Sequence, residues 1–185
     1  MEVVVTRRPR GRFFDAASAY RADPTSMLED ALDTAVRHSG AQRGNVQLLD
    51  PQAGGLQIAV QRGFEKAFLD FFRVVPADGD DASSACGRAL SSGRAVRVPN
   101  VAASSVFAGT AGLGVMLEAG ARACMSTPLT DRTGQVLGML SVHYERPQAI
   151  TVADQRLQSV IAERAAVLLT TATSGPDDEL MPAAG

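Results

Sequence analysis

The chain has 185 residues and a formal net charge of −2, and 45% of its residues are hydrophobic. This length and composition are typical of one globular domain whose core needs no disulfide or metal ion to hold it together. The near-neutral charge argues against a nucleic-acid surface, and no apolar run approaches the ~20 residues of a membrane-spanning helix. Two cysteines without CxxC spacing and two histidines are too few for a structural zinc site.

Both ends of the chain are expected to be flexible. Residues 1–24 mix Arg, Pro and Gly with a few aromatic residues and hold at most a short helix over 15–22, and residues 173–185 are rich in Pro, Asp and Ala. Arg7-Arg8 is followed by Pro9–Arg12 rather than by an apolar stretch, which argues against twin-arginine export. We therefore expect one folded domain over 25–172, in the cytoplasm, where thiols stay free.

The first half of this domain is predicted to be a helix followed by an antiparallel hairpin. Ser26 and Glu29 have the spacing of a capping box, apolar residues then recur at helical intervals, and Gly40 supplies a left-handed stop. Residues 45–49 and 56–60 alternate as strands do, with turn residues between them.

Short elements are predicted in the middle of the chain. Phe64 to Val74 has helical spacing. A short helix capped by Ser83 or Ser84 is expected to end at Gly93, and a short strand over 95–98 and a helical piece over 115–119 follow.

The second half ends in another hairpin and a long helix. Strands are predicted over 122–129 and 135–145, and Thr151 with Asp154 has capping spacing at the start of the last helix. Hairpins framed by long terminal helices indicate an α+β domain with an antiparallel sheet. The apolar stripe of the last helix is predicted to consist of Leu157, Val160, Ile161, Ala165 and Leu168.

This order of elements, and the residues that mark their ends, resemble the GAF family of small-molecule sensor domains, most of all those of bacterial signalling proteins. The resemblance implies a central antiparallel sheet of five or six strands, with the terminal helices on one face and short helices and loops over a cavity on the other. Family members bind cyclic nucleotides, tetrapyrroles, haem or small metabolites, and many pair through their terminal helices. The matching stretches are GNVQLLD (44–50), RGFEKAFLDFF (62–72), CGRALSSGRAVRVPNV (86–101), FAG (107–109), GARACMSTPL (120–129), GQVLGMLSVHYERP (134–147) and the final helix.

Strand alternation independently predicts a two-faced sheet with a polar row on the side away from the terminal helices. Val46, Leu48, Val136, Leu140 and Val142 are expected to face the helices, and Asn45, Gln47, Leu49, Leu137, Met139, Ser141 and His143 the other side, with Cys124, Ser126 and Pro128 together on one side of their strand. A covered polar side chain without a partner costs about 1–3 kcal/mol, so a ligand, a trapped water or neighbouring backbone groups must satisfy this row. The predicted ligand-binding residues are Gln47, Phe72, Cys86, Phe107, Ser126, Ser141 and His143.

Cys86 also permits an enzymatic interpretation, because it lies near the start of a short helix, where a thiol is activated as a nucleophile. One branch of the GAF family reduces free methionine sulfoxide with cysteines, one of them in the loop that corresponds to 99–118, and that loop holds no cysteine here. We favour Cys86 as a small packing residue beside Gly87. A covalent bilin is disfavoured by the Gly87-Arg88 that follows, and the cyclic-nucleotide signature of the family is not evident.

Three hypotheses remain at this point. The first is a non-enzymatic sensor or signal-transduction module that binds an unidentified small molecule, pairs as a homodimer through its terminal helices and acts on a separate output protein. The second is a thiol-based redox enzyme or sensor that uses Cys86, with Cys124 as its possible partner. The third is a structural dimerisation module whose cavity is filled. No metal site, membrane segment or nucleic-acid partner is expected, and the sequence assigns no cofactor.

Overall fold

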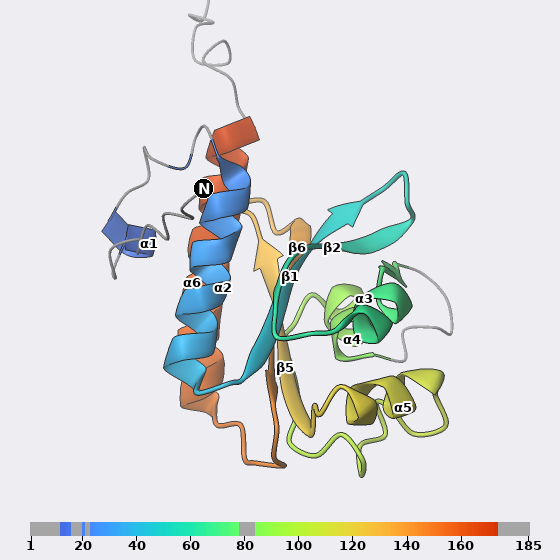
Figure 1. Ribbon diagram of the computed structural model, residues 1–185. Coiled ribbons are helices and arrows are strands. Elements are labelled where there is room, and N and C mark those ends of the chain that lie inside the picture. The colour runs from blue at the N-terminus through green and yellow to red at the C-terminus, as the bar shows by residue number, and fades with distance from the viewer. Residues whose placement is uncertain (1–11, 16–19, 21–22, 78–83, 174–185) are drawn as a thin grey trace, which may run out of the picture.

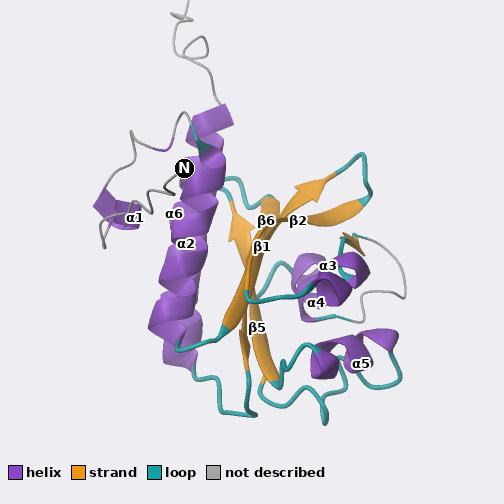
Figure 2. Cartoon of the chain, viewed as in Figure 1, coloured by secondary structure: helices purple, strands orange, loops and turns teal. Residues whose placement is uncertain are grey.

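The computed structural model describes residues 12–15, 20, 23–77 and 84–173. Within this part, two long helices cover one face of a six-stranded sheet, and three short helices lie on the opposite face (Figures 1 and 2). Most residues of the segments expected to be flexible, 1–24 and 173–185, lie outside the described part.

The sheet is antiparallel throughout, in the order β3-β2-β1-β6-β5-β4. This confirms the predicted α+β fold. The elements are α1 (Arg12–Asp15), α2 (Pro24–Ser39), β1 (Arg43–Asp50), β2 (Gly55–Arg62), α3 (Lys66–Phe71), β3 (Val74–Pro76), α4 (Ala85–Ser92), β4 (Val96–Val98), α5 (Ala111–Glu118), β5 (Ala123–Thr130), β6 (Val136–Tyr144) and α6 (Val152–Thr173).

The start of α2 differs from the prediction. Asp23, not Ser26, is the N-cap, and its carboxylate accepts a hydrogen bond from the backbone N–H of Ser26 at 3.0 Å. Pro24 occupies the first turn, where its fixed φ fits and its missing N–H costs nothing, so the helix begins before the expected Ser26–Glu29 capping box. The predicted end is confirmed, because Gly40 is the C-cap with a φ of +70°.

The helix predicted over 64–74 is shorter than expected, since α3 ends at Phe71 and the chain then forms β3. Pro76 is tolerated there because β3 is an edge strand. β3 approaches Gly55 so closely that a Cβ on that glycine would lie 2.1 Å from the carbonyl oxygen of Val75.

The later elements follow the prediction more closely. Ser84 Oγ accepts from the N–H of Gly87 at 3.0 Å and caps α4, which ends at Gly93. At the start of α6, Asp154 accepts from the N–H of Thr151 at 2.7 Å, and Thr151 Oγ1 accepts from the N–H of Asp154 at 3.1 Å. α5 begins at Ala111, earlier than expected.

An irregularity in the register between β5 and β6 corrects one predicted side-chain direction. Leu129 pairs with Gly138 and Thr130 with Val136, so Leu137 is left as an extra residue. Leu137 consequently packs with the terminal-helix core, not with Met139 on the opposite side. Such a bulge reverses the alternation on which the prediction relied.

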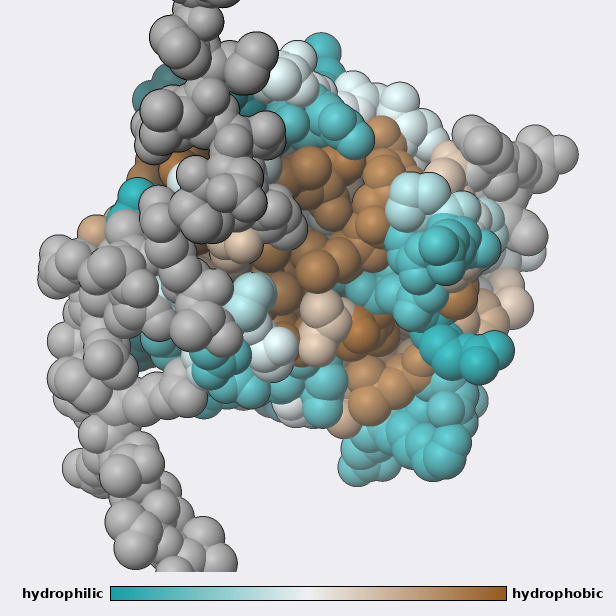
Figure 3. Space-filling model, turned by 90° about the horizontal axis from the view of Figure 1, so that it is seen from above, coloured by the Kyte–Doolittle hydropathy of each residue, from teal (hydrophilic) through white to brown (hydrophobic). Residues whose placement is uncertain are grey.

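Two apolar cores lie on the two faces of the sheet. Seen from above, hydrophobic residues run in a band through the middle of the molecule, with hydrophilic residues on its flanks (Figure 3). Small side chains let α2 and α6 pack closely on each other and on the sheet, because Ala31, Ala35, Ala162, Ala165 and Ala166 are all at most 2% exposed.

The predicted stripe of α6 is only partly correct. Ile161, Ala165 and Leu168 are buried, whereas Leu157 and Val160 are 40% and 52% exposed. None of the described helices is both long and apolar enough to cross a membrane.

Candidate functional site

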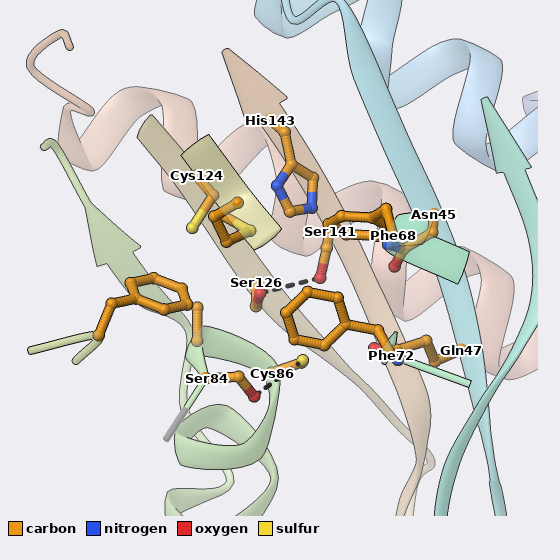
Figure 4. A pocket seen from close by; sticks show the side chains of 13 residues that line it. Asn45, Gln47, Phe68, Phe72, Ser84, Cys86, Cys124, Ser126, Ser141 and His143 are labelled. Carbon is orange, nitrogen blue, oxygen red and sulfur yellow. Dashed lines mark hydrogen bonds between the residues drawn. The ribbon is translucent and has the colours of Figure 1, made fainter. Parts of the chain in front are cut away.

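A small cavity lies between the sheet and the short helices (Figure 4). The space open to the centre of a water molecule is about 20 Å³, which is room for one or two waters. All seven residues predicted to bind a ligand line it, and their role in binding stays a prediction. The lining residues are Asn45, Gln47, Phe68, Phe72, Ser84, Ala85, Cys86, Phe107, Met116, Cys124, Ser126, Ser141 and His143.

Three neighbouring strands supply the polar floor of the cavity. Asn45 of β1 lies opposite Ser141 of β6, and Ser141 lies opposite Ser126 of β5. Because paired residues share a face, these three side chains form one row across the sheet. The hydroxyl oxygens of Ser126 and Ser141 are 2.8 Å apart and hydrogen-bonded (Figure 4).

His143 lies beside this row, paired with Cys124 across the strands. The edge-to-face rings of Phe64 and Phe68 have centroids 4.9 and 5.8 Å from that of the imidazole. Burial, followed by the positive charge of Arg43, lowers the pKa of His143 to about 3. The ring is therefore neutral at physiological pH, with one N–H donor and one acceptor nitrogen.

Several buried polar atoms of the cavity have no hydrogen-bond partner among the described residues. They are Oδ1 of Asn45, Oε1 of Gln47 and both ring nitrogens of His143. Each unsatisfied group of this kind costs about 1–3 kcal/mol, and native proteins usually satisfy such groups with water or a ligand. The residues that line the cavity therefore have free hydrogen-bonding capacity.

Both cysteines border the cavity as free thiols. Burial raises the pKa of Cys86, outweighing the opposing hydrogen bonds from Ser84 and from backbone amides. Burial also raises the pKa of Cys124, with a smaller contribution from Cys86. Because the thiolate is the nucleophilic form, the two thiols as placed here are weak nucleophiles.

Aromatic and sulfur-containing side chains close the cavity on the side of the short helices. Phe72 follows α3 and packs against Phe68 with ring centroids 4.7 Å apart, while Phe107 and Met116 are almost fully buried. Phe72 and Ser84 also border a larger outer groove. The other residues of that groove are Phe71, Val74, Val75, Pro76, Gly109, Thr110, Ala111 and Gly112.

Sequence reasoning missed some lining residues and considered others only for different roles. Asn45 was placed on the correct face by strand alternation but not among the binding residues, and Phe68 lies four residues before Phe72 on the same side of a helical turn. Met116 carried no sequence signal. Arg122, directly before β5, donates to the carbonyl oxygen of Leu117 at 2.6 Å. No three His, Cys, Asp or Glu residues of the described part lie close enough to hold a metal ion.

The profile of the GAF domain matches residues 23–169. The chain belongs to the GAF family. Its resemblance to that family over 27–171, noted from the sequence, is thereby confirmed. No curated protein matches the chain.

Solved structures share the fold at low sequence identity. The GAF domain of a phosphoenolpyruvate-protein phosphotransferase from Acinetobacter is 13% identical, with a TM-score of 0.64 over 89% of this chain and 96% of that one. The domain of a two-component sensor histidine kinase protein from Sinorhizobium meliloti 1021 is 16% identical, with a TM-score of 0.60 over 78% and 90%. Free methionine-R-sulfoxide reductase from Neisseria meningitidis, solved with its substrate, is 17% identical, with a TM-score of 0.63 over 84% and 85%.

Proposed function

We propose that this GAF domain is a non-enzymatic sensor that binds a small molecule in the cavity beneath α3, α4 and α5. The unpartnered polar atoms of Asn45, Gln47 and His143, which line one cavity, carry this proposal. A polar ligand would satisfy these atoms, while the phenylalanines would contribute apolar contact, as in most small-molecule sites. Because the cavity as it stands has room for only one or two waters, a larger ligand would enter only when the Phe72 ring moves outward.

The terminal helices are the proposed route by which binding is transmitted. Ser141 faces the cavity, and the carbonyl oxygen of the preceding residue, Leu140, accepts a hydrogen bond from Nε2 of Gln158 in α6 at 3.0 Å. A shift of β6 on ligand binding would thus reach α6 directly. Signalling requires that the ligand bind one arrangement of these elements better than another.

Native mass spectrometry of the full chain, purified from cells, tests ligand binding. We expect the wild-type protein to carry a small molecule that is lost in Ser141→Leu, because the larger side chain fills the cavity. The exposed Ser92→Leu is the matched control and should retain the molecule. A molecule retained equally by Ser141→Leu would contradict the cavity as its site.

A homodimer through the terminal helices is part of the proposal. Its support is the apolar exposed surface formed by Leu157 and Val160 of α6, since large exposed apolar side chains grouped on one helix often mark an interface. The alanines of the two helices do not contribute to this surface, because they are buried within the chain. A separate output protein would receive the signal, and the two unpaired thiols suit a cytoplasmic location.

The redox alternative has one specific observation in its favour: Cys86 and Cys124 border the same cavity, and a methionine sulfoxide reductase shares the fold. The raised pKa of both thiols weighs against it. Incubation with free methionine-R-sulfoxide and dithiothreitol tests it. Turnover by the wild-type protein that disappears in Cys86→Ser would reject the sensor hypothesis in favour of the enzyme. Absence of turnover would support the sensor hypothesis.

A further inference from the structure

We propose that the cavity selects an uncharged molecule that both donates and accepts hydrogen bonds, such as an amide, a lactam or a neutral nitrogen heterocycle. This inference rests on the proposed function, because it names the class of ligand for the same site.

The composition of the lining carries the first step. None of the thirteen lining residues is Asp, Glu, Lys or Arg. An ion moved from water into such a space loses its hydration without gaining a counter-ion, which costs several kcal/mol. An uncharged polar molecule loses far less, and its hydrogen bonds are replaced by those of the floor.

The imidazole of His143 does not supply a charge either. The ring is 5% exposed, and its depressed pKa keeps it neutral at physiological pH. The two thiols are likewise held in their protonated, neutral form by burial. Every described side chain that lines the space is therefore uncharged at physiological pH.

The positive charge of Arg43 acts on His143, but a salt bridge partly offsets it. It lies opposite His143 in the paired strands, but its Nη1 is 3.0 Å from Oε1 of Glu145. Arg43 borders a different groove, which also contains Glu65 and Glu118. A carboxylate in the cavity would thus meet a cation whose charge is balanced by acidic neighbours.

Among the described residues, the N-terminus of α4 would favour an anion through its free N–H groups. Ser84 Oγ accepts from the N–H of Gly87 there, and the same hydroxyl is hydrogen-bonded to the thiol of Cys86 at 3.2 Å. This end of the helix is consequently occupied by its own side chains.

The unpartnered atoms specify the hydrogen-bonding pattern. Oδ1 of Asn45 and Oε1 of Gln47 require donors on the ligand. The neutral ring of His143 offers one donor and one acceptor, so it requires an acceptor and a donor in return. A primary amide or a lactam carries both an N–H and a carbonyl oxygen, whereas a carboxylate lacks the donor and an amidinium lacks the acceptor.

Isosteric triads of probes test the class directly: acetamide, acetate and acetamidinium, and benzamide, benzoate and benzamidinium. Saturation-transfer NMR at pH 7 would be recorded with the wild-type chain and with Ser141→Leu, and the difference taken as the cavity signal. Ser126→Leu is a second cavity-filling variant, so the subtraction does not depend on one protein folding. We expect at least one amide to bind ten-fold or more tightly than its two ions.

Two results would overturn the inference. If an ion binds in the cavity as tightly as its amide, the preference for an uncharged ligand is wrong, but the proposal that the cavity binds a small molecule still stands. No cavity signal from any of the six probes would also reject this class, and the molecule carried in native mass spectrometry would then decide separately whether the cavity binds a ligand. A charged variant sharpens the test, because Gln47→Glu introduces a carboxylate and should move the preference from the amide to the amidinium.

Discussion

Phe72 and Ser84 both line the inner cavity and the outer groove, so the two spaces adjoin at these residues. The two spaces differ greatly in size: the centre of a water molecule has about 20 Å³ in the cavity and about 530 Å³ in the groove. We therefore expect that movement of the Phe72 ring joins them and admits a molecule larger than water.

Phe72→Ala is expected to join the cavity to the groove and so admit a larger probe. 2-Naphthamide should bind this variant but not the wild-type chain, as measured by saturation-transfer NMR. Loss of the buried ring should also lower the free energy of unfolding by about 3 kcal/mol. Phe71→Ala is the matched control, because Phe71 is 44% exposed and lines only the groove. Equal binding to both variants would show that Phe72 does not divide the two spaces.

The Ser126–Ser141 hydrogen bond should couple the two residues in stability. Ser126→Ala and Ser141→Ala each remove a bond 2.8 Å long and leave the other hydroxyl buried without it, at a cost of about 1–2 kcal/mol. The double variant should cost less than the sum of the two, because it leaves no orphaned hydroxyl. Urea unfolding of the four proteins measures this, and strict additivity would refute the coupling.

His143 should make the domain less stable in acid. Its folded pKa of about 3 lies below the ordinary value of 6.5, so between these values the unfolded chain binds a proton that the folded chain does not. The free energy of unfolding should therefore be insensitive to this residue above pH 7.5 and fall as the pH drops through 6.5 towards 3, by up to ~1.4 kcal/mol per pH unit.

Denaturant unfolding of His143→Gln and His38→Gln across pH 4–8 checks this prediction. His143→Gln should lose that part of the slope, and His38→Gln, which alters an exposed residue, should keep it. An NMR titration in which the His143 ring protonates near pH 6.5 would contradict the buried, neutral ring.

The thiols should alkylate slowly in the folded protein. At pH 7, iodoacetamide is expected to modify Cys86 at least ten-fold more slowly in the folded protein than in the unfolded chain, because burial favours the protonated thiol. Cys124, which is 0% exposed, should react more slowly still. Mass spectrometry of labelled peptides over time measures both. Rapid labelling of Cys86 would strengthen the redox alternative.

The proposed dimer should depend on the exposed side of α6. Leu157→Glu with Val160→Glu is expected to halve the mass measured by light scattering, because it places charges in an apolar contact. Val152→Glu, an equally exposed valine at a different angle around the same helix, should leave the mass unchanged. A wild-type chain that is already monomeric at high micromolar concentration would exclude this interface.

Local chemistry in the sequence was sufficient to predict most elements, because each has a pattern confined to a few residues. Gly40, Gly93 and the Thr151–Asp154 pair end or begin helices as expected. β3 was missed because three residues ending in proline carry no alternation, and they form a strand only through pairing with β2. Leu137 was misplaced because a bulge depends on the register between two strands.

The polar residues that the strands contribute to the candidate site could be predicted from the sequence, and those that the short helices contribute could be predicted less well. Strand alternation alone brings Gln47, Ser126 and Ser141 to one face. Met116 reaches the cavity only because α5 folds over it, and the neutral state of His143 depends on burial by Phe64 and Phe68. Such contacts join distant parts of the chain, and no local pattern records them.

α2 and α6 lie side by side and run in opposite directions, so that the beginning of one and the end of the other are at the same end of the molecule (Figure 1). Fluorophores attached at Thr25 and Thr171, both exposed, would therefore measure the distance between the start of α2 and the end of α6. If the sheet changes curvature when a ligand binds, the distance between α2 and α6 will change. Energy transfer between the dyes would measure that change even when the output protein is unknown.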